Sequence, residues 1–186
     1  MSDLTLVRRV QDKLERLYGV QAPCIEDFVR VTGDARENVL VRRRGGALEI
    51  RVHLPPEALL ANGSVSLDRY AQIVEGVSHF LMLVERARRV LPTTQLELEL
   101  QAEVDKFILL SRLMADTKAR ASLYENVTYL HARGTTRGQR YRLANSLAAR
   151  FVTSLPMRSK GAEAVEVLRR FFGAGQREKI EMVMAA

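Results

Sequence analysis

The chain has 186 residues, of which 47% are apolar and 27% charged, proportions typical of a soluble globular protein. No stretch approaches the roughly 20 consecutive apolar residues that a membrane-spanning helix needs. The first ten residues lack a basic region followed by an apolar run, so we expect no secretory signal. The single cysteine, Cys24, excludes an intramolecular disulfide. Together these features predict a cytoplasmic protein.

The net charge of +7 is unevenly distributed along the chain. Residues 55–105 carry 4 basic and 8 acidic side chains, whereas residues 106–186 carry 15 basic and 6 acidic ones. An excess of basic side chains attracts nucleic acids and other polyanions. The C-terminal part is therefore a candidate polyanion-binding region, although many such side chains are simply solvated or paired with carboxylates.

The N-terminal third predicts a helix followed by strands. Apolar residues recur every three or four positions over 4–17, which predicts an amphipathic helix that ends at Gly19. Residues 25–32 are a candidate first strand. Residues 38–43 and 47–54 alternate apolar and polar side chains on either side of Gly45-Gly46, which predicts a β-hairpin.

Two long helices are predicted in the middle of the chain. Pro55-Pro56 ends the second strand of the hairpin, and a short helical turn over 57–61 leads to an Asn62-Gly63 turn. Ser66 is a suitable N-cap for a helix over 67–90. Thr93 or Thr94 is a suitable cap for a second helix that reaches about residue 114. Leucines alternate at its start, which leaves an extended beginning open.

The sequence pattern of the remaining chain predicts further helices, separated by glycine or proline, over 119–133, 136–155, 161–172 and 175–184. The expected fold class is therefore α+β, with an N-terminal helix, a small antiparallel sheet and a mainly helical remainder. We expect a core over residues 1–115 and a basic helical extension over 116–186 that packs on it.

Three side chains in the middle of the chain predict a metal site. Glu75 and His79 are four residues apart, so on a helix they project from one face. Glu103 lies on the following helix. Carboxylate oxygens and imidazole nitrogens are common ligands of transition metals, so these residues are candidate metal ligands.

The two motifs resemble those of the zincin-like metallopeptidases of the ImmA/IrrE type. In that family a small sheet precedes a helix bearing H-E-x-x-H, and the next helix supplies an acidic ligand in a stretch resembling E-A-(N/D)-x-F. Here the first motif is Glu75-Gly76-Val77-Ser78-His79 and the second is Glu103-Val104-Asp105-Lys106-Phe107. The resemblance covers about residues 25–115, and two of the five positions of the first motif depart from it.

These departures change the implied chemistry. Glu75 replaces the first histidine, and the resulting Glu-His-Glu set suits manganese or iron as well as zinc. Gly76 replaces the glutamate that would deprotonate a metal-bound water, so the usual general base is missing. Glu99 is a candidate displaced base or further ligand. The alternative is that no metal binds and that His79 is a buried histidine hydrogen-bonded to neighbouring groups.

A basic loop forms a second candidate site. Arg133, Arg137, Arg140 and Arg142 surround Gly134 and Gly138, with Tyr141 interleaved, and arginines beside an aromatic ring can hold phosphate and stack a base. The loop lacks the order of a phosphate-binding P-loop. An exposed connection between two helices is the plainer interpretation.

Three functions follow from these patterns. The leading hypothesis is a non-catalytic cytoplasmic interaction or regulatory protein on a degenerate metallopeptidase-like scaffold, with a protein or peptide partner and no membrane. The first alternative is a metal-dependent hydrolase with an atypical Glu-His-Glu site. The second is a nucleic-acid-associated helical protein that binds through its basic C-terminal part.

Overall fold

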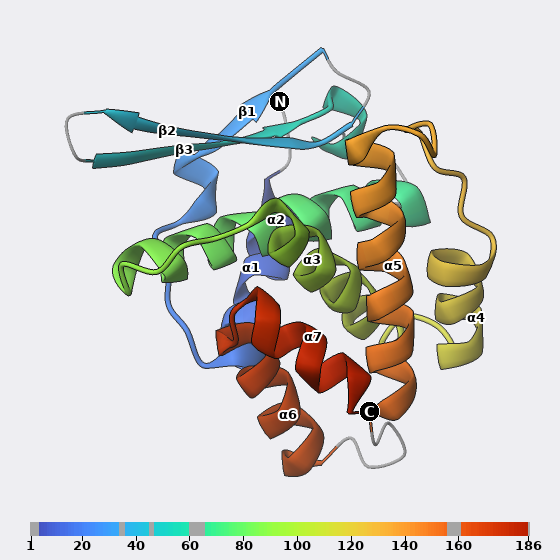
Figure 1. The fold of residues 1–186 in the computed structure, drawn as a ribbon. Helices are drawn as coiled ribbons and strands as arrows, with labels where there is room; N and C mark the ends of the chain where they lie inside the picture. Colours follow the sequence, from blue (N-terminus) through green and yellow to red (C-terminus); the bar gives the residue numbers. More distant parts are fainter. Residues whose placement is uncertain (1–3, 34–35, 45–46, 60–65, 156–160, 186) are drawn as a thin grey trace. The chain divides into compact units, whose positions relative to one another are not determined.

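The computed structural model describes residues 4–33, 36–44, 47–59, 66–155 and 161–185. They divide between two compact units, Met1–Pro92 and Thr93–Ala186. The first unit holds a helix, a small sheet and a long helix, and the described part of the second holds helices (Figure 1). The expected α+β class is confirmed. The boundary between the units follows Pro92, whereas the sequence suggested one at residue 115.

The first unit begins with α1 (Thr5–Tyr18), close to the predicted span of 4–17. Its stripe of Val7, Val10 and Leu14 is fully buried, as the three- and four-residue spacing requires. The helix packs against α2. It ends at Gly19, whose φ of 68° is a left-handed conformation that glycine adopts without steric cost.

A three-stranded sheet follows α1 in the order β1-β3-β2. The strands are β1 (Val29–Val31), β2 (Asn38–Arg44) and β3 (Ala47–Leu54). The predicted hairpin is confirmed, because β2 and β3 pair antiparallel along seven consecutive positions. The Gly45-Gly46 turn lies outside the described residues.

The sheet is mixed rather than wholly antiparallel, because β1 pairs parallel with β3. The chain reverses direction once between β1 and β2 and again between β2 and β3, so β1 and β3 run the same way. The hairpin then places β3 between the other two strands. The candidate strand over 25–32 is also shorter than expected, because residues Ile25–Asp27 form the 3₁₀ turn η1.

The long helix α2 (Leu67–Arg88) follows the short 3₁₀ turn η2 (Pro56–Leu59). The predicted cap is confirmed, because Ser66 Oγ accepts a hydrogen bond of 3.2 Å from the Arg69 N–H. The predicted Asn62-Gly63 turn lies outside the described residues. The helix packs against β3. This contact limits which side chains fit on the face of α2 that meets the sheet.

The helix α2 ends in a Schellman motif, which consists of two backbone hydrogen bonds. The Leu91 N–H donates to Arg86 O at 2.9 Å, and the Val90 N–H donates to Ala87 O at 3.2 Å. This motif needs a left-handed residue where glycine is usual, and here Val90 takes that position with φ 55°. A β-branched residue is strained in this conformation.

We expect Val90→Gly to raise the free energy of unfolding by about 1 kcal/mol. The gain from relieving the left-handed strain exceeds the entropic cost of an added glycine. The Val90 side chain is 91% exposed, so its loss removes little packing. Urea unfolding checks the value, with Val90→Ala as a control that retains the Cβ and should gain less. A loss of stability in Val90→Gly would contradict the strain argument.

The second unit is built around α3 (Gln95–Leu110), which is helical from its first residue. A capping box explains why the alternating leucines do not form a strand: Thr94 Oγ1 accepts from the Glu97 N–H, and the Glu97 carboxylate accepts from the Thr94 N–H. Helices α5 (Thr136–Ser154) and α7 (Gln176–Met184) pack on α3.

The last helices enclose an aromatic contact. The rings of Phe151 on α5 and Phe171 on α6 (Ala162–Gly173) stack with their centroids 3.9 Å apart, and both side chains are buried. The three helices predicted over 136–155, 161–172 and 175–184 are thus confirmed to within one or two residues at each end.

The helix predicted over 119–133 is largely wrong. The chain forms α4 (Asp116–Arg120) and the π-helical turn η3 (Ala121–Glu125), and residues 126–135 are irregular. Asparagine and β-branched residues at 126–128 favour a helix only weakly. The side chain of Asn145 also accounts for the exit, because its Nδ2 donates to Leu123 O at 2.8 Å. No helix in the described ranges is long and apolar enough to cross a membrane.

Candidate functional site

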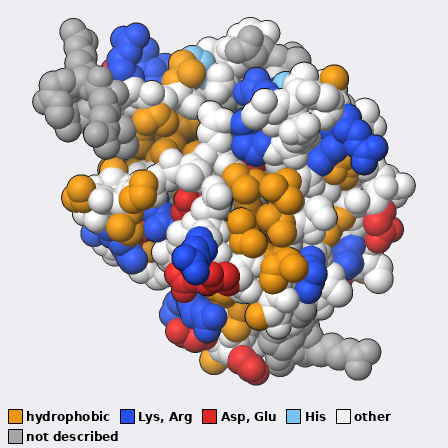
Figure 2. All heavy atoms as spheres, in the orientation of Figure 1, with side chains coloured by type: hydrophobic (Ala, Val, Ile, Leu, Met, Phe, Trp, Pro, Cys, Tyr) orange, Lys and Arg blue, Asp and Glu red, His pale blue; other side chains and the backbone are white. Residues whose placement is uncertain are grey.

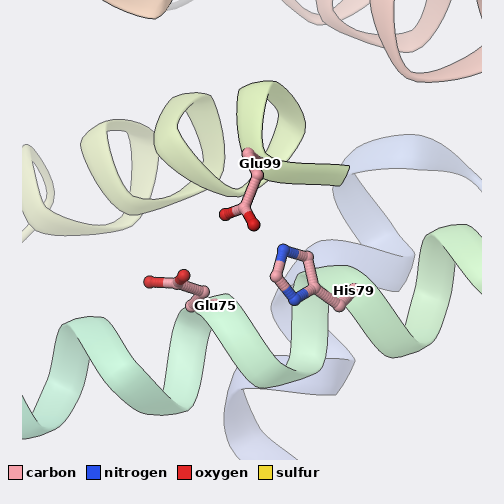
Figure 3. A group of neighbouring side chains, drawn as sticks. All are labelled: Glu75, His79 and Glu99. Carbon is pink, nitrogen blue, oxygen red and sulfur yellow. The ribbon is translucent and has the colours of Figure 1, made fainter. Parts of the chain in front are cut away.

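The Glu75 and His79 side chains rise from one face of α2, one turn apart (Figure 3). His79 is only 8% exposed, whereas Glu75 is half-buried. A buried imidazole and a carboxylate on adjacent turns can ligate one cation or hydrogen-bond to their surroundings. The arrangement that the four-residue spacing predicts is therefore present within the first unit.

Gly76, between Glu75 and His79 on α2, faces the sheet. A Cβ built on Gly76 would lie 3.1 Å from Val52 Cγ1 and 3.4 Å from Leu54 Cδ2, both on β3. The first distance is closer than nearly all real Cβ contacts, so even alanine requires a small shift. The glycine is therefore a packing residue that lets α2 approach β3 closely, and a longer side chain here would enter an apolar contact.

Glu99 and Glu103 lie one turn apart on α3, and both are buried. Both carboxylate oxygens of Glu103 are bound within the second unit. Oε1 accepts from Lys106 Nζ at 2.6 Å, and Oε2 accepts from Asn145 Nδ2 at 3.2 Å. Glu103 is thus already charge-paired and hydrogen-bonded, which favours a structural role for it.

Within the second unit, the Arg140 guanidinium lies 4.0 Å from Glu99 Oε1. Within the first unit, Glu75 and His79 are a candidate ligand pair that offers one carboxylate and one imidazole. Such a set is hard enough for manganese or iron and also acceptable to zinc.

Asn145 is the centre of a buried polar cluster in the second unit. Besides Glu103 and the Leu123 carbonyl, it binds Tyr129, whose hydroxyl donates to Asn145 Oδ1 at 3.0 Å. Burial and, next, the Glu103 charge raise the pKa of Tyr129, and the same two causes raise that of Tyr124 well above its usual range. Both phenols are therefore neutral hydrogen-bond donors at physiological pH rather than bases.

A second buried network was missed in the sequence. Lys179 on α7 is fully buried, and its Nζ donates to Gln101 Oε1 and to the Phe171 carbonyl, both at 2.5 Å. Gln101 Nε2 in turn donates to Asp105 Oδ1 at 3.0 Å. The sequence signal for this network was the presence of polar side chains within the apolar stretch 100–110. They are four residues apart and therefore lie on one helix face. Only packing shows that α7 supplies the lysine.

The basic loop connects η3 to α5 and is held together by hydrogen bonds. Thr135 Oγ1 donates to Ala132 O and accepts from the Gly138 N–H. A Cβ on Gly138 would lie 2.1 Å from the Ala132 carbonyl oxygen, so only glycine fits this close approach. The Arg142 guanidinium donates to His131 O and to Gly138 O.

The four candidate polyanion-binding arginines therefore differ in role. Arg142 stacks on the Tyr129 ring at 4.3 Å and closes the loop, and Arg140 faces Glu99, whereas Arg133 and Arg137 are exposed. In the face drawn in Figure 2, basic side chains lie in several separate groups, and acidic side chains adjoin some of them. The contacts of Arg140 and Arg142 favour paired arginines over a dedicated polyanion site in this loop.

Comparisons with known proteins add no relative: no family model, curated protein or solved structure matches this chain.

Proposed function

We propose that this chain is a non-catalytic interaction or regulatory protein of the cytoplasm, built on a metallopeptidase-like scaffold without a working base. The observation that carries the proposal is the packing of Gly76 against Val52 and Leu54 on β3. A general base must reach the water that it deprotonates. In this chain the corresponding position serves the contact between helix and sheet.

The proposal includes a divalent cation held by Glu75 and His79, which lie one turn apart on α2. Support comes from the donor types of this pair and from the burial of His79. Bound there, the metal would supply positive charge beside the Glu75 carboxylate and so stabilise the fold.

The metal part is tested by elemental analysis of protein purified without a histidine tag. We expect about one equivalent of zinc, manganese or iron, and a higher unfolding temperature with metal than in chelator. His79→Ala should lose the metal. His53→Ala is the matched control. It removes another of the chain's three histidines, the one on β3, and should retain the metal.

The outcomes separate the two parts of the proposal. Metal-free wild-type protein whose stability is unchanged in chelator would remove the metal site and leave His79 as a buried structural histidine. Peptide or ester hydrolysis that Glu99→Gln abolishes and His53→Ala preserves would overturn the non-catalytic assignment.

A further inference from the structure

The outer edge of β2 is a candidate pairing site in the described part of the first unit. Among the described strands β3 lies on one side of β2, and none lies on the other. An edge strand presents a row of backbone N–H and C=O groups that can pair with another extended chain. The opposite edge differs, because β1 has only three paired residues, whereas β2 has seven.

Most devices that block edge pairing are absent from the described part of β2. Proteins commonly protect edges with proline, a bulge, a short strand or charged side chains. Residues 38–44 contain no proline, and their register with β3 advances one residue at a time without a bulge. The protective feature that β2 does have is charge, because residues 42–44 are three consecutive arginines. Basic charge disfavours basic partners and attracts acidic ones.

The apolar part of the strand is exposed on both faces. Leu40 and Val41 are 47% and 45% exposed, and consecutive residues of a strand point to opposite sides of the sheet. A strand added beside β2 would therefore cover apolar surface on both faces as well as satisfy backbone groups. Beside this pair, the strand carries positive charge towards its C-terminal end.

We propose that β2 docks an extended, acidic segment of a partner protein, which adds to the sheet as a fourth strand antiparallel to β2. Antiparallel pairing puts the partner's acidic residues first, opposite the arginines, and its apolar residues next, opposite Val41, Leu40 and Val39. Strand addition supplies affinity through backbone pairing and specificity through the alternating side chains. The inference rests on the proposed interaction role and is independent of the metal.

A second copy of this chain is a poorer occupant of the same edge. Pairing β2 with its own copy brings a further three arginines to the edge, with no acidic side chain among residues 38–44 to compensate. Six arginines on two adjoining strands repel one another through their summed charge even where they are not directly opposite. Charge complementarity thus selects an acidic partner.

The test uses the full chain and the synthetic peptide acetyl-Glu-Glu-Glu-Val-Ile-Val-Thr-amide. We expect saturable binding that weakens as salt rises, together with slower hydrogen exchange of β2 amides. N-methylation of every second peptide amide on the pairing edge should weaken binding about tenfold or more, because it removes several hydrogen bonds. This control leaves the protein unaltered, so its folding is not in question.

Charge is tested on the protein side. Arg42→Gln should weaken peptide binding several-fold, whereas Arg30→Gln, on β1 at the opposite edge, should not. A peptide with lysine in place of glutamate should bind more weakly than the acidic one.

Three results would overturn the proposal: no binding at millimolar peptide, equal binding of the N-methylated peptide, or protection of amides away from β2. A dimer in sedimentation whose formation protects the β2 amides would show that a second copy occupies the edge instead. Titration in chelator distinguishes this proposal from the metal site. Peptide binding that persists in metal-free protein supports the β2 proposal independently of the metal site. A metal-loaded protein that does not bind the peptide refutes the β2 proposal and leaves the metal site standing.

Discussion

Gly76→Glu should lower the free energy of unfolding by about 4 kcal/mol or more, enough to unfold much of the protein at moderate temperature. The new side chain must enter the contact with β3, where the Cβ alone already lies 3.1 Å from Val52 Cγ1. Overpacking costs about 1–3 kcal/mol, and burying a carboxylate without a partner adds to it. Glu37 Oε2, 3.9 Å from the same Cβ, adds repulsion. Urea unfolding followed by circular dichroism measures the loss.

Two controls separate packing from helix chemistry. Gly76→Ala adds one methyl group and gains about 1 kcal/mol of helix propensity, so its net effect should stay within about 1 kcal/mol. Ala87→Glu places the same glutamate on the exposed end of α2 and should be nearly neutral. A Gly76→Glu protein as stable as the wild type would mean that the base position is accessible, and the main support for a non-catalytic role would disappear.

Lys179→Met should lower the free energy of unfolding by about 3 kcal/mol. The methionine fills a similar volume, but Gln101 Oε1 and the Phe171 carbonyl lose the ammonium that they bind at 2.5 Å. Removing one partner from a buried charged network leaves the other groups poorly satisfied. The Nζ also lies 4.1 Å from the Phe171 ring centroid, so a cation–π contact is lost too.

The network is tested by a double-mutant cycle. Lys118→Met, on an exposed position of α4, is the matched control and should change stability by less than about 0.5 kcal/mol. Combining Lys179→Met with Gln101→Leu should cost less than the sum of the single changes, because both act on one network. Strict additivity would show that Lys179 and Gln101 do not stabilise each other.

The two predictions concern different links between sequence and function. Gly76 bears on whether the metallopeptidase resemblance implies any catalysis, because the resemblance would place the base at this position. Lys179 tests whether the polar residues of α3 are structural. If they are, the burial of Glu103 with Lys106 and Asn145 has the same explanation.

Local sequence signals predicted most of the elements. The spacing of Val7, Val10 and Leu14 indicated α1, and Ser66 marked the start of α2. Thr93 or Thr94 was the expected cap of α3, and the structure uses Thr94. Alternation around Gly45-Gly46 indicated the hairpin. These signals act between residues a few positions apart, so one sequence suffices to read them. The one-turn spacing of Glu75 and His79 is of the same kind.

Long-range packing decided the rest. The parallel pairing of β1 with β3 depends on which edge the hairpin leaves open, and the end of η3 depends on Asn145, 22 residues from the carbonyl that it binds. The interpretation of Gly76 changed for the same reason: the resemblance implies only that a base is missing, whereas the fold places β3 against Gly76.

By itself, then, the sequence determined the α+β class, most of the helix boundaries and the placement of Glu75 and His79 on one helix face. Only the tertiary structure decided that Gly76 is a packing residue, that Glu103 is already engaged and that no described strand pairs with the outer edge of β2. The first group depends on backbone geometry that repeats every few residues. The second depends on side chains that meet after the chain has folded, and local periodicity carries no information about which ones do.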